Sequence, residues 1–473
     1  MEVNLFTTFT TSLPFASLPS FHHFITLEPV YQREQGPLTL SNMAFETLFT
    51  RKNQSAWSGR EHWTELCHLH ISDEKAKQEN ESKRSPSNGK DRLRTGLVED
   101  GYVLVDDVVE EQLTSNLKDA IISLHARGYP ATFVLLYDET WELARLALKT
   151  LSVATHPSNI FNFDILAWHI DPRENVAGFS PHRDRQPIDV KSSFHEDQQA
   201  KYVTMWMALT DATPENSCLY VIPKQSDPGY TDGDSDSGTD LTDQRDDPLW
   251  RALSNKESFQ NIRALPRQAG QSVIFTHRIL HWGSRGNPNS LQHEPRVAIS
   301  FVCSDPTFER PYLNSSHFPP NFTTRLLLVC AQLLMYYQRL DLPKECIRAC
   351  YEYCKDHAAE LDTAYRNKVT VEFVKAMKEA TDSNSNGDLQ DTDENDDGDD
   401  ALLEAMLDAE EGGYGDFEDE FDELEESSPR CFVDHDESQE DDDHAAVSLF
   451  GKRPHDKRGE DEAAKKMKAK EAS

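Results

Sequence analysis

The pattern of apolar and polar residues along the chain is most regular between residues 159 and 305. There, short runs rich in β-branched and aromatic residues alternate with turn residues, and each run has the length of a strand. The runs are "FNFDILAWHI", "KYVTMWMALTDA", "CLYVIP", "NIRALP", "QSVIFTHRIL" and "RVAISFVC". Several short strands separated by turn signals predict an all-β sandwich or barrel.

Helical patterns flank this β-rich block. Upstream, "DGYVLVDDVV" predicts a strand, and "EEQLTSNLKDAIISLHARG" predicts a helix because its apolar residues recur at helical spacing until Gly128. Downstream, helices are predicted over about 322–340, 343–358 and 361–380. The longest apolar run, "LLLVCAQLLMYY", is shorter than the roughly 20 residues that a membrane span needs, so it predicts a buried helix.

Four regions follow from these patterns. We expect residues 1–94 to be poorly ordered, because residues 1–45 are rich in Ser, Thr, Phe and Pro without a clear period and residues 75–94 form a charged linker. Residues 95–318 contain the β domain, residues 319–380 form a helical extension, and residues 381–473 form a disordered acidic tail with a basic C-terminus.

A polar excursion interrupts the β-rich block between Lys224 and about Gln260, and it contains "TDGDSDSGTD". We interpret it as an inserted surface loop, and its length is also compatible with a lid over a site.

The net charge of −35 is concentrated in the tail. Residues 381–443 contain 28 acidic residues and one basic residue, Arg430. High net charge and low apolar content are typical of disorder, so this acidity says little about a substrate. It favours a basic protein partner for the tail, and no direct binding of nucleic acid is expected.

The remaining localisation signals point to an intracellular protein. The eight cysteines are scattered without a disulfide framework, and no stretch has the composition of a secretion signal. Residues 452–466, "KRPHDKRGEDEAAKK", resemble a bipartite nuclear localisation signal, with a solvated charged helix as the alternative. We therefore expect location in the cytoplasm or the nucleus and no secretion.

Two groups of residues have the composition of a metal site without its usual spacing. Cys346, Cys350 and Cys354 share one stripe of a predicted helix, and "EHWTELCHLH" at 61–70 combines histidines with a cysteine. Neither group has a second ligand pair at zinc-finger spacing. We therefore favour a buried core position for the cysteines and no metal site at 61–70.

The stretch "GFSPHRDRQP" contains a candidate pair of metal ligands. His182 and Asp184 are two positions apart, and on an extended strand such residues point the same way, with Arg183 turned to the other side. We assign no role to Arg183. An iron site for oxygen chemistry commonly combines two histidines and one carboxylate. Such a pair alone is weak evidence, because it more often lies in a charged turn.

The next two strands supply the other parts of such a site. "GQSVIFTHRILHWGSRGNP" offers His277 and His281 as a second histidine, and "EPRVAISFVCSD" places Arg296 at the start of a strand. A guanidinium can hold a carboxylate through two parallel hydrogen bonds, as the far end of 2-oxoglutarate would require. A surface ion pair is the alternative for Arg296.

Taken together, "GFSPHRDRQ", "VTMWMALTDATPENSCLYVIPKQSDPG", "GQSVIFTHRILHWGSRGN" and "PRVAISF" resemble the phytanoyl-CoA dioxygenase family of iron(II)- and 2-oxoglutarate-dependent oxygenases. The resemblance covers roughly residues 95–308. It implies a double-stranded β-helix, a cupin-like jelly-roll barrel with helices on its outside. It also implies Fe(II) and 2-oxoglutarate as cofactors and O₂ as co-substrate.

The resemblance also implies roles for individual residues. His182 and Asp184 match the proximal metal ligands, and His281 matches the distal ligand in preference to His277, although Trp282 separates His281 from the Gly-Ser turn.

The same resemblance implies the residues that bind the co-substrate. Arg296 matches the anchor of 2-oxoglutarate, and Trp206 and Ser284 match positions that line the co-substrate pocket.

The predicted function is an Fe(II)- and 2-oxoglutarate-dependent dioxygenase that hydroxylates a small organic substrate and releases succinate and CO₂. The presence of Asp184 favours hydroxylation over halogenation, because related halogenases leave the carboxylate position vacant. The alternative is a non-catalytic jelly-roll scaffold or binding protein whose acidic tail binds basic partners.

Overall fold

The structure of the chain is a computed structural model, and it describes most of the residues between 45 and 385. All of them belong to one compact unit, Met1–Ser428. The acidic tail beyond residue 385 and the predicted localisation signal at 452–466 lie outside the described residues. The described residues are 45, 47–72, 90–174, 178–187, 189–234, 248–290, 294–315, 317–340 and 342–385.

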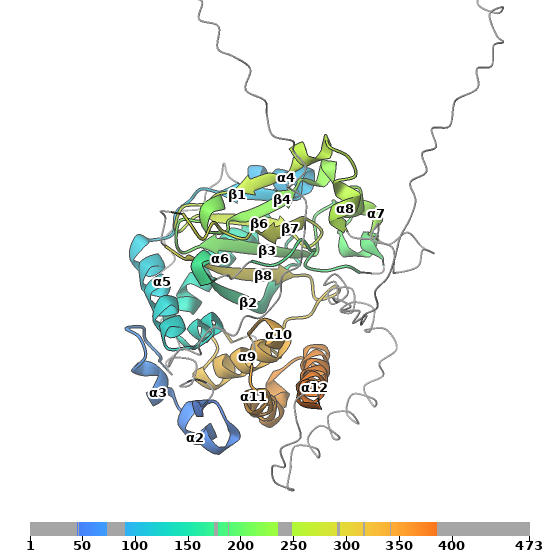
Figure 1. The fold of residues 1–473 in the computed structure, drawn as a ribbon. Coiled ribbons are helices and arrows are strands. Elements are labelled where there is room, and N and C mark those ends of the chain that lie inside the picture. Colours follow the sequence, from blue (N-terminus) through green and yellow to red (C-terminus); the bar gives the residue numbers. More distant parts are fainter. Residues whose placement is uncertain are drawn as a thin grey trace, which may run out of the picture. The chain divides into compact units, whose positions relative to one another are not determined.

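Two antiparallel sheets form the centre of this unit (Figure 1). The major sheet has the strand order β1-β6-β3-β8-β2, and the minor sheet has the order β5-β4-β7. These strands overlap the predicted runs, so the predicted β core with flanking helices is confirmed, although the single run predicted over 271–280 is divided between β6 and β7 in different sheets. The strands are β1 (Tyr102–Val105), β2 (Ile160–Ile170), β3 (Tyr202–Ala208), β4 (Leu219–Ile222), β5 (Arg263–Leu265), β6 (Ser272–Thr276), β7 (Leu280–Gly283) and β8 (Arg296–Ser304).

The central strand β3 separates two hydrophobic clusters. Met205 and Met207 belong to the cluster that includes the helices, whereas Trp206 and Ala208 belong to the cluster shared with the minor sheet. Successive residues of a strand point to opposite faces, so this division follows from the sequence order alone. The cluster shared with the minor sheet lies next to the residues of the candidate site.

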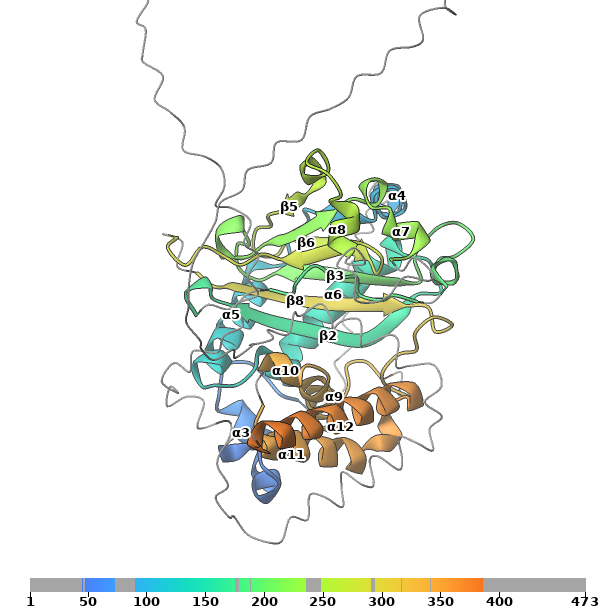
Figure 2. The ribbon, with the colours of Figure 1, turned by 45° about the vertical axis from the view of Figure 1, so that its right-hand side comes forward.

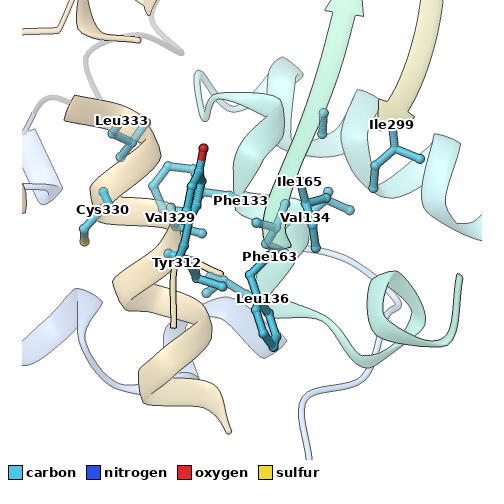
Figure 3. Close-up of a cluster of buried hydrophobic side chains, with 14 of the residues drawn as sticks. Phe133, Val134, Leu136, Phe163, Ile165, Ile299, Tyr312, Val329, Cys330 and Leu333 are labelled. Carbon is cyan, nitrogen blue, oxygen red and sulfur yellow. The ribbon is translucent and has the colours of Figure 1, made fainter. Parts of the chain in front are cut away.

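Helices cover the other face of the major sheet and the side next to β2 (Figure 2). In Figure 3, Val329 of α9 lies on the side of the helix that is turned toward Phe163 and Ile165 of β2. Cys330 and Leu333 belong to the same hydrophobic cluster. The helical extension therefore shares one core with the β domain. The longer helices are α4 (Lys90–Asp100), α5 (Glu111–Ala126), α6 (Asp138–Ala154), α9 (Phe322–Met335), α11 (Lys344–Asp356) and α12 (Thr363–Ser385), and short α10 (Tyr337–Leu340) follows α9.

The apolar run in α9 and the cysteine stripe in α11 are buried, as expected. Cys346, Cys350 and Cys354 lie in the same buried core as α9. Among the described helices, none is long and apolar enough to cross a membrane.

The expectation of a poorly ordered N-terminal region is wrong for residues 47–72. Short helices α2 (Gln54–Trp57) and α3 (Arg60–Thr64) bury Trp57 and Trp63 completely. The Trp63 ring stacks on that of Phe133, with 4.8 Å between centroids. Each short helix contributes a single large aromatic side chain, so no apolar period marks it in the sequence.

Two histidines of the histidine-rich stretch contact different residues. Nε2 of His62 lies 3.0 Å from the hydroxyl of Tyr129, whereas Nδ1 of His70 lies 2.6 Å from a carboxylate oxygen of Glu139.

The beginning of the polar excursion is only partly a surface loop, because Asp227, Gly229, Tyr230 and Asp234 are buried. The guanidinium of Arg183 is fully buried between Asp227 and Asp234 and is 2.6 Å from a carboxylate oxygen of each. Arg278 donates to the carbonyl of Gly229 at 2.7 Å. Arg183, which had no assigned role, therefore fixes the chain between residues 227 and 234 beside the candidate ligands. Residues 235–247 lie outside the described part of the chain.

Asp227→Asn should reduce the free energy of unfolding by about 3–5 kcal/mol, because it leaves part of the buried Arg183 charge without its partner. The matched control is Asp106→Asn, since the Asp106 side chain is 59% exposed in its 2.7 Å pair with Arg267. That change should cost at most about 1 kcal/mol. Denaturant unfolding of the two variants measures the difference, and equal losses would contradict the structural role given to Arg183.

Candidate metal centre

The stretch that carries His182 and Asp184 pairs with β7 through its backbone. His182 and His281 form an antiparallel bridge in which each N–H donates to the other's carbonyl at 3.0 Å. The N–H of Asp184 donates to the carbonyl of His277 at 3.1 Å. Residues that face each other in an antiparallel pair share a face, as do residues i and i+2 of one strand. The backbone pairing therefore turns His182, Asp184 and His281 to the same side.

The donor atoms of these three side chains all lie within 4.8 Å of one another. Oδ1 of Asp184 is 3.4 Å from Nε2 of His281 and 3.7 Å from Nε2 of His182. Neighbouring ligands of one ion stand about 3 Å apart at bond lengths of about 2.0–2.2 Å. The three groups therefore have the composition and spacing for one metal ion bound on one face.

Hydrogen bonds orient each of the three side chains. Nδ1 of His182 and Nδ1 of His281 each bond the backbone carbonyl two residues earlier, at 2.7 and 3.1 Å. A carbonyl only accepts, so Nδ1 carries the proton and Nε2 presents its lone pair to the site. Oδ2 of Asp184 accepts a hydrogen bond from the hydroxyl of Thr204 at 2.6 Å, which leaves Oδ1 toward the histidines.

Burial lowers the pKa of His182 to about 3, and the nearby His281 adds to this effect. For Asp184, burial acts to raise the pKa, but His281, His182 and the Thr204 hydroxyl together hold it below its ordinary value. At neutral pH these residues therefore provide a neutral imidazole and a carboxylate, the protonation states that bind metal.

A direct contact between two glycines holds the His182 stretch against β7. A Cβ on Gly178 would lie 2.6 Å from Cα of Gly283, and a Cβ on Gly283 would lie 2.9 Å from Cα of Gly178. The N–H of Gly283 donates to the carbonyl of Phe179 at 3.0 Å. Any side chain at either position would push the two backbones apart and separate the donor atoms.

His277, the competing distal ligand, lies apart from the three donors. Its ring packs among those of Phe194, Tyr202 and Phe308, and its Nδ1 faces the Tyr202 carbonyl at 3.2 Å. The geometry therefore favours His281 over His277 as the third donor. His277 contributes its backbone carbonyl, which pairs with Asp184.

Arg296 begins β8 and is buried, with 3% of its surface exposed. Its guanidinium carbon lies 5.7 Å from the centre of the Trp206 ring, so the structure brings these two predicted residues together. Burial lowers the pKa of Arg296 to about 10, and the group stays charged at neutral pH. Among the described residues it forms no ion pair, and its Nε has no hydrogen-bond partner. An uncompensated buried cation is costly, so the position of Arg296 is suited to an anionic ligand.

Two serines border the same region. A Cβ on Gly283 would lie 3.6 Å from Nη1 of Arg296 and 3.4 Å from Oγ of Ser217. Ser217 has a φ of 77°, which is uncommon for serine, and its buried Oγ has no hydrogen-bond partner. Ser284, predicted to line the pocket, directly follows β7, and its Oγ is also buried. The sequence pattern does not reveal Ser217, because a single left-handed residue leaves no periodic signal.

Aromatic rings gather beside His182. The Phe179 ring lies 5.2 Å from that of His182, and Trp168 meets Phe179 edge to face at 4.7 Å. Tyr336 lies 6.3 Å from the rings of both Phe179 and Trp168, and the guanidinium of Arg339 lies 3.5 Å from the centre of the Phe179 ring. The helical extension therefore reaches the candidate metal centre, which its position after the β domain did not predict.

Comparison with known families supports the same interpretation. Residues 124–290 match the family model described as phytanoyl-CoA dioxygenase (PhyH). The chain carries a domain of this family. The predicted family is thereby confirmed, and the phytanoyl-CoA dioxygenase match contains His182, Asp184 and His281 but ends before Arg296.

Several solved structures are similar to part of the phytanoyl-CoA dioxygenase domain and its surroundings. One is the epimerase SnoN from nogalamycin biosynthesis in complex with Fe³⁺, alpha ketoglutarate and nogalamycin RO. It is 22% identical, with 46% of this chain and 84% of that chain covered and a TM-score of 0.33.

Two further structures cover a similar share of the chain. HygX from Streptomyces hygroscopicus with nickel and 2-oxoglutarate bound is 12% identical, with 48% of this chain and 90% of that chain covered and a TM-score of 0.31. EctD from S. alaskensis in its apoform is 15% identical, with 50% of this chain and 84% of that chain covered and a TM-score of 0.30. No curated protein sequence matches the chain.

Thr204→Val should weaken Fe(II) binding by about 10- to 100-fold, because it removes the hydrogen bond that orients Asp184 while conserving side-chain shape. Thr204→Ser, which keeps the hydroxyl, is the matched control and should bind within a few fold of the unaltered protein. Titration of Fe(II) under anaerobic conditions measures both affinities. Equal affinity of the valine and serine variants would contradict the orienting role of Thr204.

Proposed function

We propose that the protein is an Fe(II)- and 2-oxoglutarate-dependent dioxygenase that hydroxylates a small organic substrate. The observation that carries this proposal is the convergence of His182, Asp184 and His281, together with the burial of Arg296 without an ion pair among the described residues. The three donors suit a divalent metal, and Arg296 suits an anion. 2-Oxoglutarate is a ligand that needs both.

The residues present fit iron and 2-oxoglutarate. Two imidazoles and one carboxylate are the donor set of non-haem iron(II) oxygenases, a set that would leave room on the metal for other ligands. When bound, iron and 2-oxoglutarate supply an oxidative decarboxylation in which one oxygen atom of O₂ enters succinate, CO₂ leaves, and the other oxygen atom oxidises the substrate.

The chain's own residues hold the reactants in place. His182, Asp184 and His281 would bind the metal, and Thr204 holds the carboxylate of Asp184 in one orientation. Arg296 would hold the far carboxylate of 2-oxoglutarate, with Trp206 against its guanidinium and the Ser217 hydroxyl free to donate. Ser284 would border the pocket from the end of β7. We further propose that the two sheets close into a double-stranded β-helix around this site.

The substrate would meet the metal on the side where Phe179, Trp168 and Tyr336 gather beside His182. Apolar rings there would exclude water from the reacting atoms and favour an organic substrate with an apolar or planar part. Because Tyr336 and Arg339 come from residues after α9, the helical extension would contribute to the choice of substrate.

The alternative is a non-catalytic jelly-roll protein that acts through its acidic tail. The tail lies outside the described residues, so this alternative rests on composition alone. The orientation of three metal donors by separate hydrogen bonds favours the enzyme, because a scaffold gains nothing from it.

The purified full chain with Fe(II) should release succinate from 2-oxoglutarate under air, because slow uncoupled turnover needs no identified substrate. Asp184→Ala should abolish this release by removing a ligand, whereas His277→Phe should retain most of it. Succinate measured by mass spectrometry provides the result. Absence of iron binding by the unaltered protein would overturn the proposal, and equal loss in both variants would contradict the choice of ligands.

Arg296→Leu should raise the KM for 2-oxoglutarate by at least about 100-fold, since an ion pair in a buried site contributes several kcal/mol to ligand binding. Fe(II) affinity should change little, because Arg296 does not contact the donor atoms. The KM of Arg296→Lys for 2-oxoglutarate should lie between those of the unaltered protein and of Arg296→Leu, because lysine keeps the charge and loses the planar fork. If KM for 2-oxoglutarate is unchanged in the leucine variant, Arg296 is not the anchor.

A further inference from the structure

A second group of convergent donors lies on the helix-facing side of β2, outside the candidate iron centre. It consists of His125 in the last turn of α5, His169 on β2, and Glu174 in the short helical turn Pro172–Glu174. One donor atom from each of these residues lies within 4.8 Å of the other two. The three residues come from separate elements, so the tertiary fold brings them together.

The imidazoles of His125 and His169 stack, with 3.8 Å between ring centroids and 21° between ring planes. Nε2 of His125 lies 3.2 and 3.3 Å from the two carboxylate oxygens of Glu174. Nδ1 of His169 is buried and has no hydrogen-bond partner. Burial and the adjacent His125 lower the pKa of His169 to about 4, so at neutral pH its ring is uncharged and offers a lone pair.

The charged groups around this cluster leave Glu174 available to a cation. The guanidinium of Arg173 is held by Asp171, with 2.9 Å between Nε and Oδ1, and Arg127 donates to the backbone carbonyl of Ser123. Within the described ranges, Glu174 forms no ion pair with lysine or arginine, and His125 is its partner.

A second stacked histidine pair shows that stacking alone does not create such a group. His156 and His195 stack with 3.7 Å between centroids, but Nδ1 of His156 accepts a hydrogen bond from the N–H of Ser158. Nε2 of His195 lies 3.3 Å from the side-chain oxygen of Asn159. One nitrogen of each ring is thus used within the protein, and within the described residues the pair belongs to no three-donor group.

We propose that His125, His169 and Glu174 bind a divalent transition-metal ion of the zinc class at a site separate from the candidate iron centre. Two imidazoles and one carboxylate are a common donor set for zinc, and the fourth position is left to water. The site requires neither iron nor 2-oxoglutarate, so it does not depend on the proposed function.

An ion at this site would link α5 to β2 close to the aromatic rings beside His182. Trp168, the neighbour of His169 in β2, points to the opposite face and packs against Phe179, whose ring contacts that of His182. Binding would therefore restrain the strand that carries Trp168, one of these aromatic residues. The ion would have a structural or regulatory effect.

The test counts Zn²⁺ bound to the full chain after metals have been removed with a chelator. Since Zn²⁺ would also enter the candidate iron centre, the measurement uses a background variant with His182→Ala and His281→Ala. Equilibrium dialysis followed by elemental analysis should find one tightly bound Zn²⁺ on this background. Adding His125→Ala and His169→Ala should remove that equivalent, and adding Glu174→Gln should weaken its binding by at least about tenfold.

The matched control adds His195→Ala to the same background, which removes one member of the other stacked pair and should leave the bound Zn²⁺ unchanged. The side chains of His125 and Glu174 are 41% and 47% exposed, so His125→Ala and Glu174→Gln should fold normally. Thermal unfolding in chelator verifies this for each variant. Retention of the bound Zn²⁺ with unchanged affinity in folded His125→Ala and Glu174→Gln variants would overturn the proposal, whatever the outcome of the succinate assay.

Discussion

The candidate active centre depends on one backbone pairing, the antiparallel bridge between His182 and His281. Because two residues that face each other in such a pair share a face, their two hydrogen bonds align both imidazoles. The contact between Gly178 and Gly283 brings the two segments close enough for the bridge to form. The remaining parts of the site, including Asp184 two residues later and its partner Thr204, are positioned relative to that pairing.

Two buried arginines near this bridge illustrate how the surroundings of a charge distinguish a structural group from a functional one. Arg183 is fully buried, but two carboxylates and a backbone carbonyl satisfy its guanidinium. Arg296 is equally buried without any carboxylate partner among the described residues. A buried pair with good geometry is tolerated at modest net cost, whereas an unpaired charge is retained where a ligand compensates it. This contrast supports the assignment of Arg183 to the fold and of Arg296 to the co-substrate.

The helical extension has a larger part in the molecule than its place in the chain indicates. Residues of α9 and α11 share the core with β2, and Tyr336 and Arg339 approach the rings beside His182. The extension would therefore contribute both to the stability of the sheet and to the recognition of substrate. The family match ends at residue 290, so it contains Trp168 and Phe179 but neither Tyr336 nor Arg339.

The sequence by itself determined most of the strands, helix α5 and the helices of the extension, and it drew attention to the His182–Asp184 pair, because alternation and local spacing carry that information directly. The family came from the resemblance of several motifs. The pattern did not mark α6, and α4 begins at Lys90, within the stretch expected to be a linker. It also ranked His281 above His277, but only through the resemblance. The tertiary structure decided which residues meet over long separations. The pairing of β7 with the His182 stretch placed the side chain of His281, and not that of His277, beside His182. Packing alone brought Trp57 and Trp63 into the core, joined Arg183 to Asp227 and Asp234, and placed His125 beside His169 and Glu174. Such contacts depend on the distance between elements in space, and no periodic pattern along a single chain encodes that distance.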